Sequence, residues 1–130
     1  MKTAAIVPAF NEAESLPDVL QEIKQAFPEH LIVVVDDGST DGTSEIAKEF
    51  GCVCLSMPFN LGIGGALRLG FRYCNEKEIE RAYQFDADGQ HDPTQISLLL
   101  SGLQKADMVI GSRFSEENSY EVGRSRKTAM

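Results

Sequence analysis

Short apolar runs alternate along this chain with segments in which apolar residues recur at helical spacing. The runs have the length and continuous hydrophobicity of strands that are buried on both faces, as in a parallel sheet. The predicted strands are Thr3–Pro8, His30–Asp36, Val53–Met57, Ala82–Phe85 and Met108–Gly111. The predicted helices are Glu12–Phe27, Thr43–Phe50, Gly64–Asn75 and Pro93–Gln104. This alternation predicts an α/β fold, with a mostly parallel sheet and helices on both of its faces.

Prolines and an acidic residue set several of the predicted boundaries. Pro8 cannot donate to a strand ladder, so we expect it to end the first strand. Pro28 should stop the first helix. Asp92 and Pro93 have the residue types of an N-cap and a first helical position, respectively. From Phe114 onward the sequence is polar, and its pattern predicts no element.

The segment after the fourth predicted strand holds the strongest candidate for a metal site. Asp86 and Asp88 are two residues apart, so in extended backbone both carboxylates share one face. Gly89 permits a sharp turn, after which Gln90 can bring an amide oxygen toward the same point. Such oxygen ligands suit a hard divalent cation, Mg²⁺ or Mn²⁺. The same pattern also fits a polar turn that only caps the next helix.

Other polar side chains follow the predicted strands at the same end. Asn11 and Glu12 follow the first strand, and Asp36 and Asp37 follow the second. In an open α/β sheet the ligand lies beyond the carboxyl ends of the strands, near the point where strand order reverses. We therefore expect these acids and the Asp86 segment to gather at one edge of the sheet.

The loop from Asp36 to Gly42 has two interpretations. Asp37 is an acceptor when it is ionised, so it suits the N–H and O–H groups of a nucleotide base or ribose. Alternatively the loop is only a strand-to-helix turn, with Asp41 as the N-cap of the next helix.

Glycines open the third predicted helix in the segment Asn60–Ala66. A helix N-terminus attracts anions through its free N–H groups and its dipole, but these glycines also permit close packing against a sheet. The spacing is not that of a dinucleotide fingerprint, and the segment does not follow the first strand. Arg113, after the fifth strand, could neutralise a diphosphate or pair with a nearby acid.

Composition narrows the functional classes. A chain of 130 residues has room for one domain, and its net charge of −8 argues against general binding of nucleic acid. The three cysteines form no CxxC pair, which indicates reduced thiols in a cytoplasmic protein. No apolar run is long enough to span a membrane.

Five segments together resemble family 2 glycosyltransferases of the GT-A fold, a three-layer sandwich, and in particular the branch that transfers sugars to dolichyl or polyprenyl phosphate. The segments occur in the order Pro8–Glu12, Val35–Gly42, Asn60–Ala66, Asp86–Pro93 and Gly111–Phe114. Ile63 departs from the family pattern, because many relatives carry Lys or Arg in that loop.

The resemblance implies a set of functional residues. Those expected to bind the nucleotide sugar are Pro8, Phe10, Glu12, Val35, Asp37, Gly64, Gly65, Asp86, Ala87, Asp88 and Arg113. Asp86, Asp88 and Gln90 would hold Mg²⁺ or Mn²⁺, which makes Asp88 the expected catalytic residue. The implied donor is a UDP- or GDP-linked sugar, and the implied acceptor is a lipid phosphate or a glycan. The implied reaction is a single inverting displacement at the anomeric carbon.

The resemblance also implies that the chain is the front part of a longer protein. Residues 1–114 would form the nucleotide-sugar-binding part, and the polar, basic tail 115–130 would begin the acceptor-binding part. The full-length parent would then associate with the inner face of a membrane. A sheet that lacks its later strand exposes an edge, which favours homodimerisation.

Two other functional classes stay open at this point. One is a non-catalytic module that binds nucleotide sugars. The other is a sugar-nucleotide nucleotidyltransferase, although that class carries a Gly-rich, Arg-containing loop after the first strand, where this chain has Phe10, Asn11 and Glu12.

Overall fold

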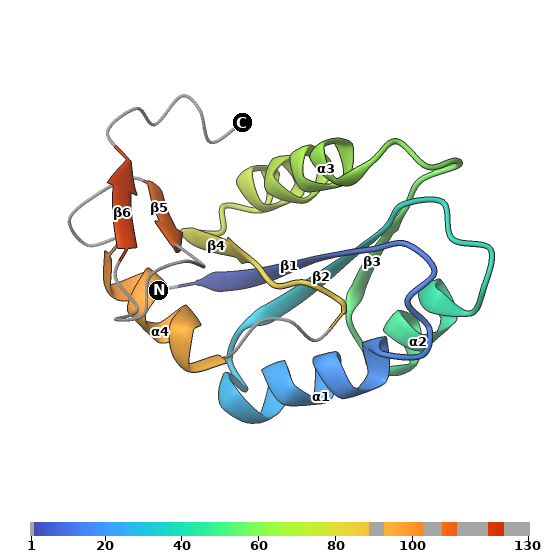
Figure 1. The fold of residues 1–130 in the computed structure, drawn as a ribbon, viewed down its shortest axis with the longest axis horizontal. Helices are drawn as coiled ribbons and strands as arrows, with labels where there is room; N and C mark the ends of the chain where they lie inside the picture. The colour runs from blue at the N-terminus through green and yellow to red at the C-terminus, as the bar shows by residue number, and fades with distance from the viewer. Residues whose placement is uncertain (1, 89–92, 103–107, 112–119, 124–130) are drawn as a thin grey trace. The chain divides into compact units, whose positions relative to one another are not determined.

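The computed structural model describes residues 2–88, 93–102, 108–111 and 120–123, which belong to two units, Met1–His91 and Asp92–Met130. The first unit contains seven elements, coloured blue to yellow in Figure 1. They are β1 (Thr3–Ala9), α1 (Leu16–Ala26), β2 (Leu31–Asp36), α2 (Thr43–Glu49), β3 (Val53–Ser56), α3 (Ile63–Glu76) and β4 (Arg81–Gln84). The strand-helix alternation expected from the sequence is therefore present in this unit.

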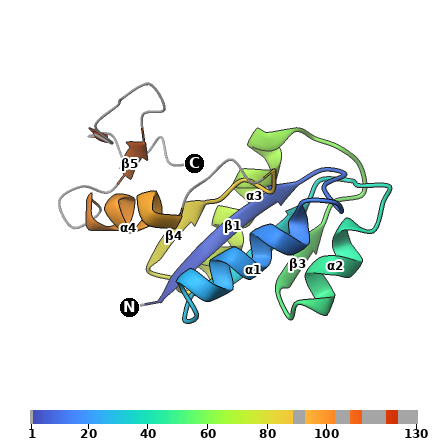
Figure 2. The same cartoon turned by 60° about the horizontal axis from the view of Figure 1, so that its bottom comes forward.

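The four strands of the first unit form one parallel sheet in the order β3-β2-β1-β4. Helices α1 and α2 cover one face of this sheet, and α3 covers the other (Figures 1 and 2). The three layers follow from the continuous apolar strands, because a strand buried on both faces needs a cover on each.

Alternate strand residues build the two halves of the core. Ala4, Ile6, Val33 and Val35 are fully buried on the α3 side, where they pack with Ala66 and Cys74. By the two-residue repeat of a strand, Ala5, Val7, Ile32 and Val34 lie on the opposite face, which α1 and α2 cover. Helix α1 presents Leu16, Val19, Leu20 and Ile23 as its buried residues.

Helix α3 lies very close to β1 at Gly70. A Cβ added at Gly70 would be 2.5 Å from Cγ2 of Ile6. Because carbon atoms in contact are about 3.5–4.0 Å apart, no larger residue fits here without a shift. Gly70 thus sets the distance between α3 and the sheet, and with it the position of the first turn of α3.

Two boundaries of the first unit differ from prediction. Helix α1 begins at Leu16 and not at Glu12, so that Pro17 falls in its first turn, where its missing N–H costs no helical hydrogen bond. Strand β1 continues one residue past Pro8, to Ala9.

The alternating bonds of β1 explain why Pro8 does not end it. The backbone carbonyl of Ile6 accepts from Phe85 N–H on the β4 side, so the nitrogen of Pro8, two residues on, faces the same side. Pairing with β4 ends at Ile6 and Gln84, whereas pairing with β2 continues through Ala9. The proline therefore removes no bond from the ladder with β2.

The second unit contains α4 (Pro93–Gly102), β5 (Met108–Gly111) and β6 (Tyr120–Gly123). The strand predicted at Met108–Gly111 is confirmed as β5, which pairs antiparallel with β6 in a sheet of two strands. Strand β6 was not predicted, because Tyr120–Gly123 is short and lies among polar residues. Tyr120 and Val122 are nevertheless good strand formers, and this is the signal that the sequence contains.

Within the described residues, no helix combines the length and the apolar character needed to cross a bilayer. The three cysteines are all free, and burial raises the pKa of the Cys52, Cys54 and Cys74 thiols. The raised pKa favours the protonated, less reactive form of each thiol.

Candidate functional site

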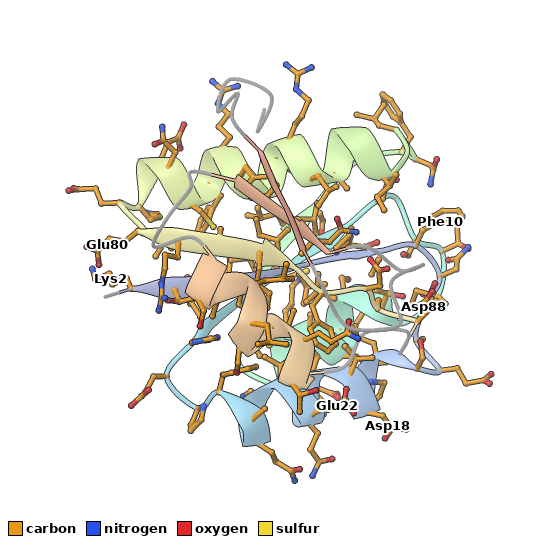
Figure 3. All side chains as sticks on the ribbon, turned by 60° about the vertical axis from the view of Figure 1, so that its left-hand side comes forward. Lys2, Phe10, Asp18, Glu22, Glu80 and Asp88 are labelled. Carbon is orange, nitrogen blue, oxygen red and sulfur yellow. The ribbon has the colours of Figure 1, made fainter. Side chains whose placement is uncertain are left out.

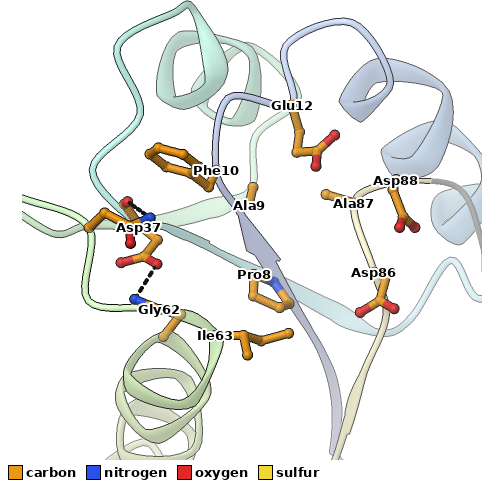
Figure 4. Close-up of a pocket in the computed structure, with 12 residues that line it drawn as sticks. Pro8, Ala9, Phe10, Glu12, Asp37, Gly62, Ile63, Asp86, Ala87 and Asp88 are labelled. Carbon is orange, nitrogen blue, oxygen red and sulfur yellow. Dashed lines mark hydrogen bonds between the residues drawn. The ribbon is translucent and has the colours of Figure 1, made fainter.

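A pocket of about 280 Å³ lies in the first unit at the carboxyl ends of β1, β2 and β4 (Figure 4). The residues that line it are Pro8, Ala9, Phe10, Glu12, Asp37, Asn60, Gly62, Ile63, Ala66, Asp86, Ala87 and Asp88. They come from the end of β1, from the segments that follow β1, β2 and β4, and from the loop and first turn at the start of α3.

The strand order explains why a pocket forms here. From β1 the chain moves outward to β2 and β3, with α1 and α2 on one face, and then returns through α3 on the other face to β4. Strand order reverses between β1 and β4, and connections at such a point diverge to opposite faces and leave a crevice. Phe10 and Glu12 follow β1 into this crevice, and Asp86 and Asp88 follow β4.

The segment after β4 carries the two aspartates of the expected metal site. In Figure 4 the side chains of Asp86 and Asp88 project from this segment on the same side, with Ala87 between them turned away. Gln84 Nε2 donates a 2.7 Å hydrogen bond to Asp86 Oδ1. The hydroxyl of Ser15 donates a 2.6 Å hydrogen bond to the backbone carbonyl of Ala87, and Glu12 Oε2 lies 3.1 Å from the same hydroxyl oxygen. Ser15 therefore ties the start of α1 to this segment, a role that no sequence pattern indicated.

The loop after β1 is bound to the loop after β2 by side-chain bonds to backbone groups. Asn11 has the left-handed φ of 53°, its N–H donates to Ser39 Oγ at 2.8 Å, and its Oδ1 accepts from Thr40 N–H at 2.8 Å. Glu12 N–H donates to Thr43 Oγ1 at 3.1 Å. These bonds fix where Phe10 and Glu12 leave β1.

Asp41 does not occupy the N-cap position predicted for it. Helix α2 begins at Thr43 with Gly42 at the N-cap, and Asp41 accepts from Thr43 N–H at 3.0 Å from one residue farther out. The Thr43 hydroxyl also donates to Asp41, and this bond is the main cause that holds the pKa of that carboxyl below its ordinary value. The difference arises because Asp41 also accepts from Ala13 N–H, which draws the carboxylate toward the loop after β1.

Asp37 is buried at the wall of the pocket and makes bonds within the protein. Its Oδ1 accepts from Leu61 N–H at 2.8 Å. Its Oδ2 accepts from Gly62 N–H at 2.9 Å (Figure 4). The expectation that Asp37 binds a base or a ribose stays a prediction.

The electrostatic character of the pocket is acidic. The described lining includes four carboxylates, those of Glu12, Asp37, Asp86 and Asp88, and no Lys, Arg or His. Phe10 and Ile63 add apolar surface and are 45% and 57% exposed. Because the carboxylates repel anions at this range, a phosphate group needs an accompanying cation to enter.

The remaining predicted residues fall in other places. Val35 is buried in the core beneath α3, and neither it nor Gly64 nor Gly65 belongs to the described lining. Gln90 and Arg113 lie outside the described residues. Their binding roles stay predictions. The lining residues Asn60, Gly62, Ile63 and Ala66 all come from the glycine-containing segment that the sequence marked.

In the described part of the chain, no group of three or more His, Cys, Asp or Glu side chains is arranged to hold a metal. The described donors of the expected site are the two carboxylates of Asp86 and Asp88. Hard carboxylate oxygens are the correct donor type for Mg²⁺ or Mn²⁺, which complete their coordination with water and substrate phosphates. The residues present therefore fit the expected cation chemically.

The glycosyl transferase family 2 model matches residues 4–128 of this chain. The chain belongs to glycosyltransferase family 2. The undecaprenyl-phosphate mannosyltransferase of Micrococcus luteus is 40% identical over 118 residues, which cover 87% of this chain and 49% of that protein. The polyprenol monophosphomannose synthase of Mycolicibacterium smegmatis is 35% identical over 120 residues, which cover 87% and 45%. The resemblance to this family is thus confirmed, and the chain spans about half the length of these curated relatives.

Solved structures of the GT-A fold superpose on this one. A mannosyltransferase of Pyrobaculum calidifontis in complex with GDP-Man and Mn²⁺ matches with a TM-score of 0.63 and 23% identity, over 85% of this chain and 34% of that one. S. aureus TarS 1–349 in complex with UDP matches with a TM-score of 0.64 and 21% identity, over 82% and 33%. At this identity the likeness concerns the fold, and the predicted GT-A fold is confirmed.

Proposed function

We propose that the pocket binds a UDP- or GDP-linked sugar together with Mg²⁺ or Mn²⁺, and that the protein to which this chain belongs transfers the sugar to a polyprenyl phosphate. The observation that carries this proposal is the acidic pocket at the reversal of strand order. Four carboxylates and no cationic side chain in the described lining make it a poor site for a bare diphosphate. They make it a good site for a diphosphate that enters with a divalent cation.

The residues that line the pocket would have two roles, binding the cation and binding the nucleoside. Asp86 and Asp88 would hold the cation, and Gln84 restrains the Asp86 carboxylate through its 2.7 Å bond. When bound, the cation supplies positive charge to the diphosphate that leaves as the sugar is transferred. Phe10 and Asp37 lie on the opposite side of the pocket, where the apolar surface of Phe10 suits a base, and Pro8 and Glu12 lie between the two sides (Figure 4). The Glu12 carboxylate, beside Ala87, suits the hydroxyl groups of a ribose.

The relatives support the choice of acceptor. The name of the protein that is 40% identical specifies undecaprenyl phosphate, and the name of the protein that is 35% identical specifies polyprenol monophosphomannose as the product. A lipid phosphate is already an anion and attacks the anomeric carbon without a strong base. The proposed inverting displacement by this acceptor therefore requires no further carboxylate for proton removal.

Titration calorimetry with UDP-mannose and GDP-mannose, with and without Mn²⁺, tests the proposal. We expect binding only when Mn²⁺ is present, and its loss in Asp88→Ala. Asp18→Asn is the matched control, because Asp18 is an exposed carboxylate that points into solvent from α1 (Figure 3). Equal binding without the metal, or binding that Asp88→Ala leaves unchanged, would refute the proposed cation site.

A second candidate function is a non-catalytic module that binds the nucleotide sugar without turnover. The described lining, with its carboxylates and its apolar surface, suits binding of the nucleotide sugar whether or not transfer follows. A turnover assay with GDP-mannose, Mn²⁺ and undecaprenyl phosphate separates the two. Release of GDP that depends on the lipid phosphate identifies the enzyme, and binding without release identifies the module.

A further inference from the structure

Ser15, the residue before α1, has the place and the residue type of a helix N-cap. Ser15 and Asp18 also have the spacing of a capping box, in which the serine oxygen accepts from the backbone N–H at the third helical position. Within the described part of the chain, the Ser15 side chain makes no such cap bond, although the residue is the N-cap of α1. A cap bond would stabilise the helix, so the hydroxyl is used for a different contact at the cost of that stabilisation.

This contact is with the segment after β4. Ser15 Oγ donates a 2.6 Å hydrogen bond to the backbone carbonyl of Ala87, and Glu12 Oε2 lies 3.1 Å from the same Oγ. A hydroxyl has one proton, and a carbonyl and an ionised carboxylate are both acceptors, so the two oxygens compete for that proton. The distance of 2.6 Å is the shorter one and is in the range of a good O–H···O bond, which assigns the proton to Ala87.

The carbonyl of Ala87 belongs to the peptide group that leads into Asp88. Because a peptide group is planar and rigid, the direction of this carbonyl fixes the nitrogen and the Cα from which the Asp88 side chain projects. Pairing of β4 with β1 ends at Gln84, so the strand ladder does not extend to this peptide. The Ser15 bond therefore orients a part of the backbone that the sheet does not.

Each half of the expected cation site is thus restrained by one side chain. Gln84 Nε2 bonds to Asp86 Oδ1 at 2.7 Å from the same strand, whereas Ser15 bonds to Ala87 from the start of α1. The start of α1 is itself well anchored, because Leu16 is fully buried and its N–H donates to the Glu12 carbonyl at 2.9 Å. Ser15 therefore transfers the position of a packed helix to the segment that carries the aspartates.

We propose that Ser15 is a positioning residue of the cation site, whose hydroxyl holds the Ala87 carbonyl and thereby the direction of the Asp88 carboxylate. Asp86 and Asp88 project on the same side of their segment (Figure 4), where two ionised carboxylates repel each other. The Ser15 bond opposes a rotation of the backbone that would turn them apart. The part of this inference that concerns the cation rests on the proposed function, and the part that concerns the bond does not.

The carbonyl ¹³C chemical shift of Ala87, measured without metal or ligand, tests the bond. A hydrogen bond withdraws electron density from a carbonyl carbon, so we expect Ser15→Ala to move this signal upfield and Ser15→Thr, which keeps the hydroxyl, to move it far less. Ser15→Gly is a second variant without the hydroxyl, since glycine is also tolerated at an N-cap, and it should act like Ser15→Ala. An unchanged Ala87 signal in the variants without the hydroxyl would overturn the inference.

Ser44→Ala is the matched control. Ser44 is also half-buried at the start of a helix, and its hydroxyl lies 3.5 Å from Oε1 of the neighbouring Glu45. This substitution should leave the Ala87 signal where it is in the unsubstituted protein.

Affinity for Mn²⁺ alone, measured from the EPR signal of the free ion, tests the positioning role. We expect Ser15→Ala to weaken Mn²⁺ binding by about threefold to tenfold, the equivalent of one hydrogen bond. Ser15→Thr should restore the affinity, and Ser44→Ala should not change it. Unchanged Mn²⁺ affinity in Ser15→Ala, or no restoration by Ser15→Thr, would overturn the inference. The proposed cation site would still stand if Asp88→Ala abolished binding in the same assay.

Affinity for uridine and guanosine separates an action through Ala87 from an action through Glu12. These nucleosides carry no phosphate and need no cation, so Ser15→Ala should leave their affinity in NMR titrations unchanged. Weaker nucleoside binding with unchanged Mn²⁺ affinity would place the action of Ser15 at Glu12 and contradict the proposal. If the unsubstituted protein binds neither Mn²⁺ nor a nucleoside, the proposed function fails, whereas the Ala87 signal still decides whether the Ser15 bond exists.

Discussion

The close contact between Gly70 and Ile6 leads to a prediction about stability. The effect of Gly70→Ala on the free energy of unfolding should change sign when Ile6 is replaced by alanine. Gly70→Ala adds a Cβ at 2.5 Å from Ile6 Cγ2 and at 3.4 Å from both Cγ1 and Cδ1 of the same side chain. The overlap with Cγ2 is about 1 Å relative to ordinary carbon contact. Ile6 is fully buried in the central strand, and its β-branched side chain is stiff at χ1, so the methyl has no easy escape.

Overpacking and helix propensity act in opposite directions on the free energy of unfolding of Gly70→Ala. Overpacking in a core costs about 1–3 kcal/mol, and the short distance places this case near the upper end. Alanine in place of glycine inside a helix returns about 1 kcal/mol. We therefore expect Gly70→Ala to lower the free energy of unfolding by about 2 kcal/mol.

The same substitution in an Ile6→Ala background should have the opposite effect. Ile6→Ala alone costs about 2–5 kcal/mol as a cavity-forming change. It removes the three atoms nearest to the new Cβ, so Gly70→Ala should then stabilise the protein by about 1 kcal/mol. The coupling between the two sites is about 3 kcal/mol, at the upper end of values for residues in contact.

Urea unfolding of the four proteins in this cycle measures the coupling. Gly64→Ala is the control on the same helix, because a Cβ at Gly64 meets nothing within 4 Å. It should leave the stability equal or slightly raised. A neutral Gly70→Ala in the unsubstituted protein, or equal effects in the two backgrounds, would show that α3 does not pack on β1 as described.

Two further predictions concern other parts of the first unit. Gly38→Ala should destabilise the protein by about 1–3 kcal/mol in urea unfolding, because Cβ at a φ of +78° would also lie 2.6 Å from Asn60 N; a neutral result would contradict the close approach of the loops that contain Gly38 and Asn60. Burial, with Arg81 as the second cause, lowers the pKa of His30, whose Nδ1 lies 2.8 Å from the Tyr83 hydroxyl. As pH falls, the imidazole therefore takes up a proton in the unfolded chain before it does in the folded protein. The free energy of unfolding should fall as pH drops below about 6.5, and His30→Gln should flatten this slope. Identical slopes for the two proteins would show that His30 is as easily protonated in the folded state.

Much of the first unit could be predicted because its signals are local. The apolar runs around Val33 and Ile6, and the helical spacing of Leu16 to Ile23, depend only on neighbouring residues. For the same reason the acids after β1, β2 and β4 could be assigned to one sheet edge before any strand order was known. Two predicted boundaries were wrong, the start of a helix at Glu12 and the end of a strand at Pro8. Both depend on which part of the structure the backbone nitrogen of that residue faces.

The sequence by itself determined the family, the order of strands and helices, and the acidic residues that follow the strands. Tertiary structure alone decided that β1 lies between β2 and β4, which creates the crevice, and that β5 pairs with β6. It also decided that the carboxylate of Asp37 bonds to Leu61 and Gly62. The physical reason is range: periodicity and capping act over a few residues, whereas strand order and contacts between loops arise only when distant segments are packed together.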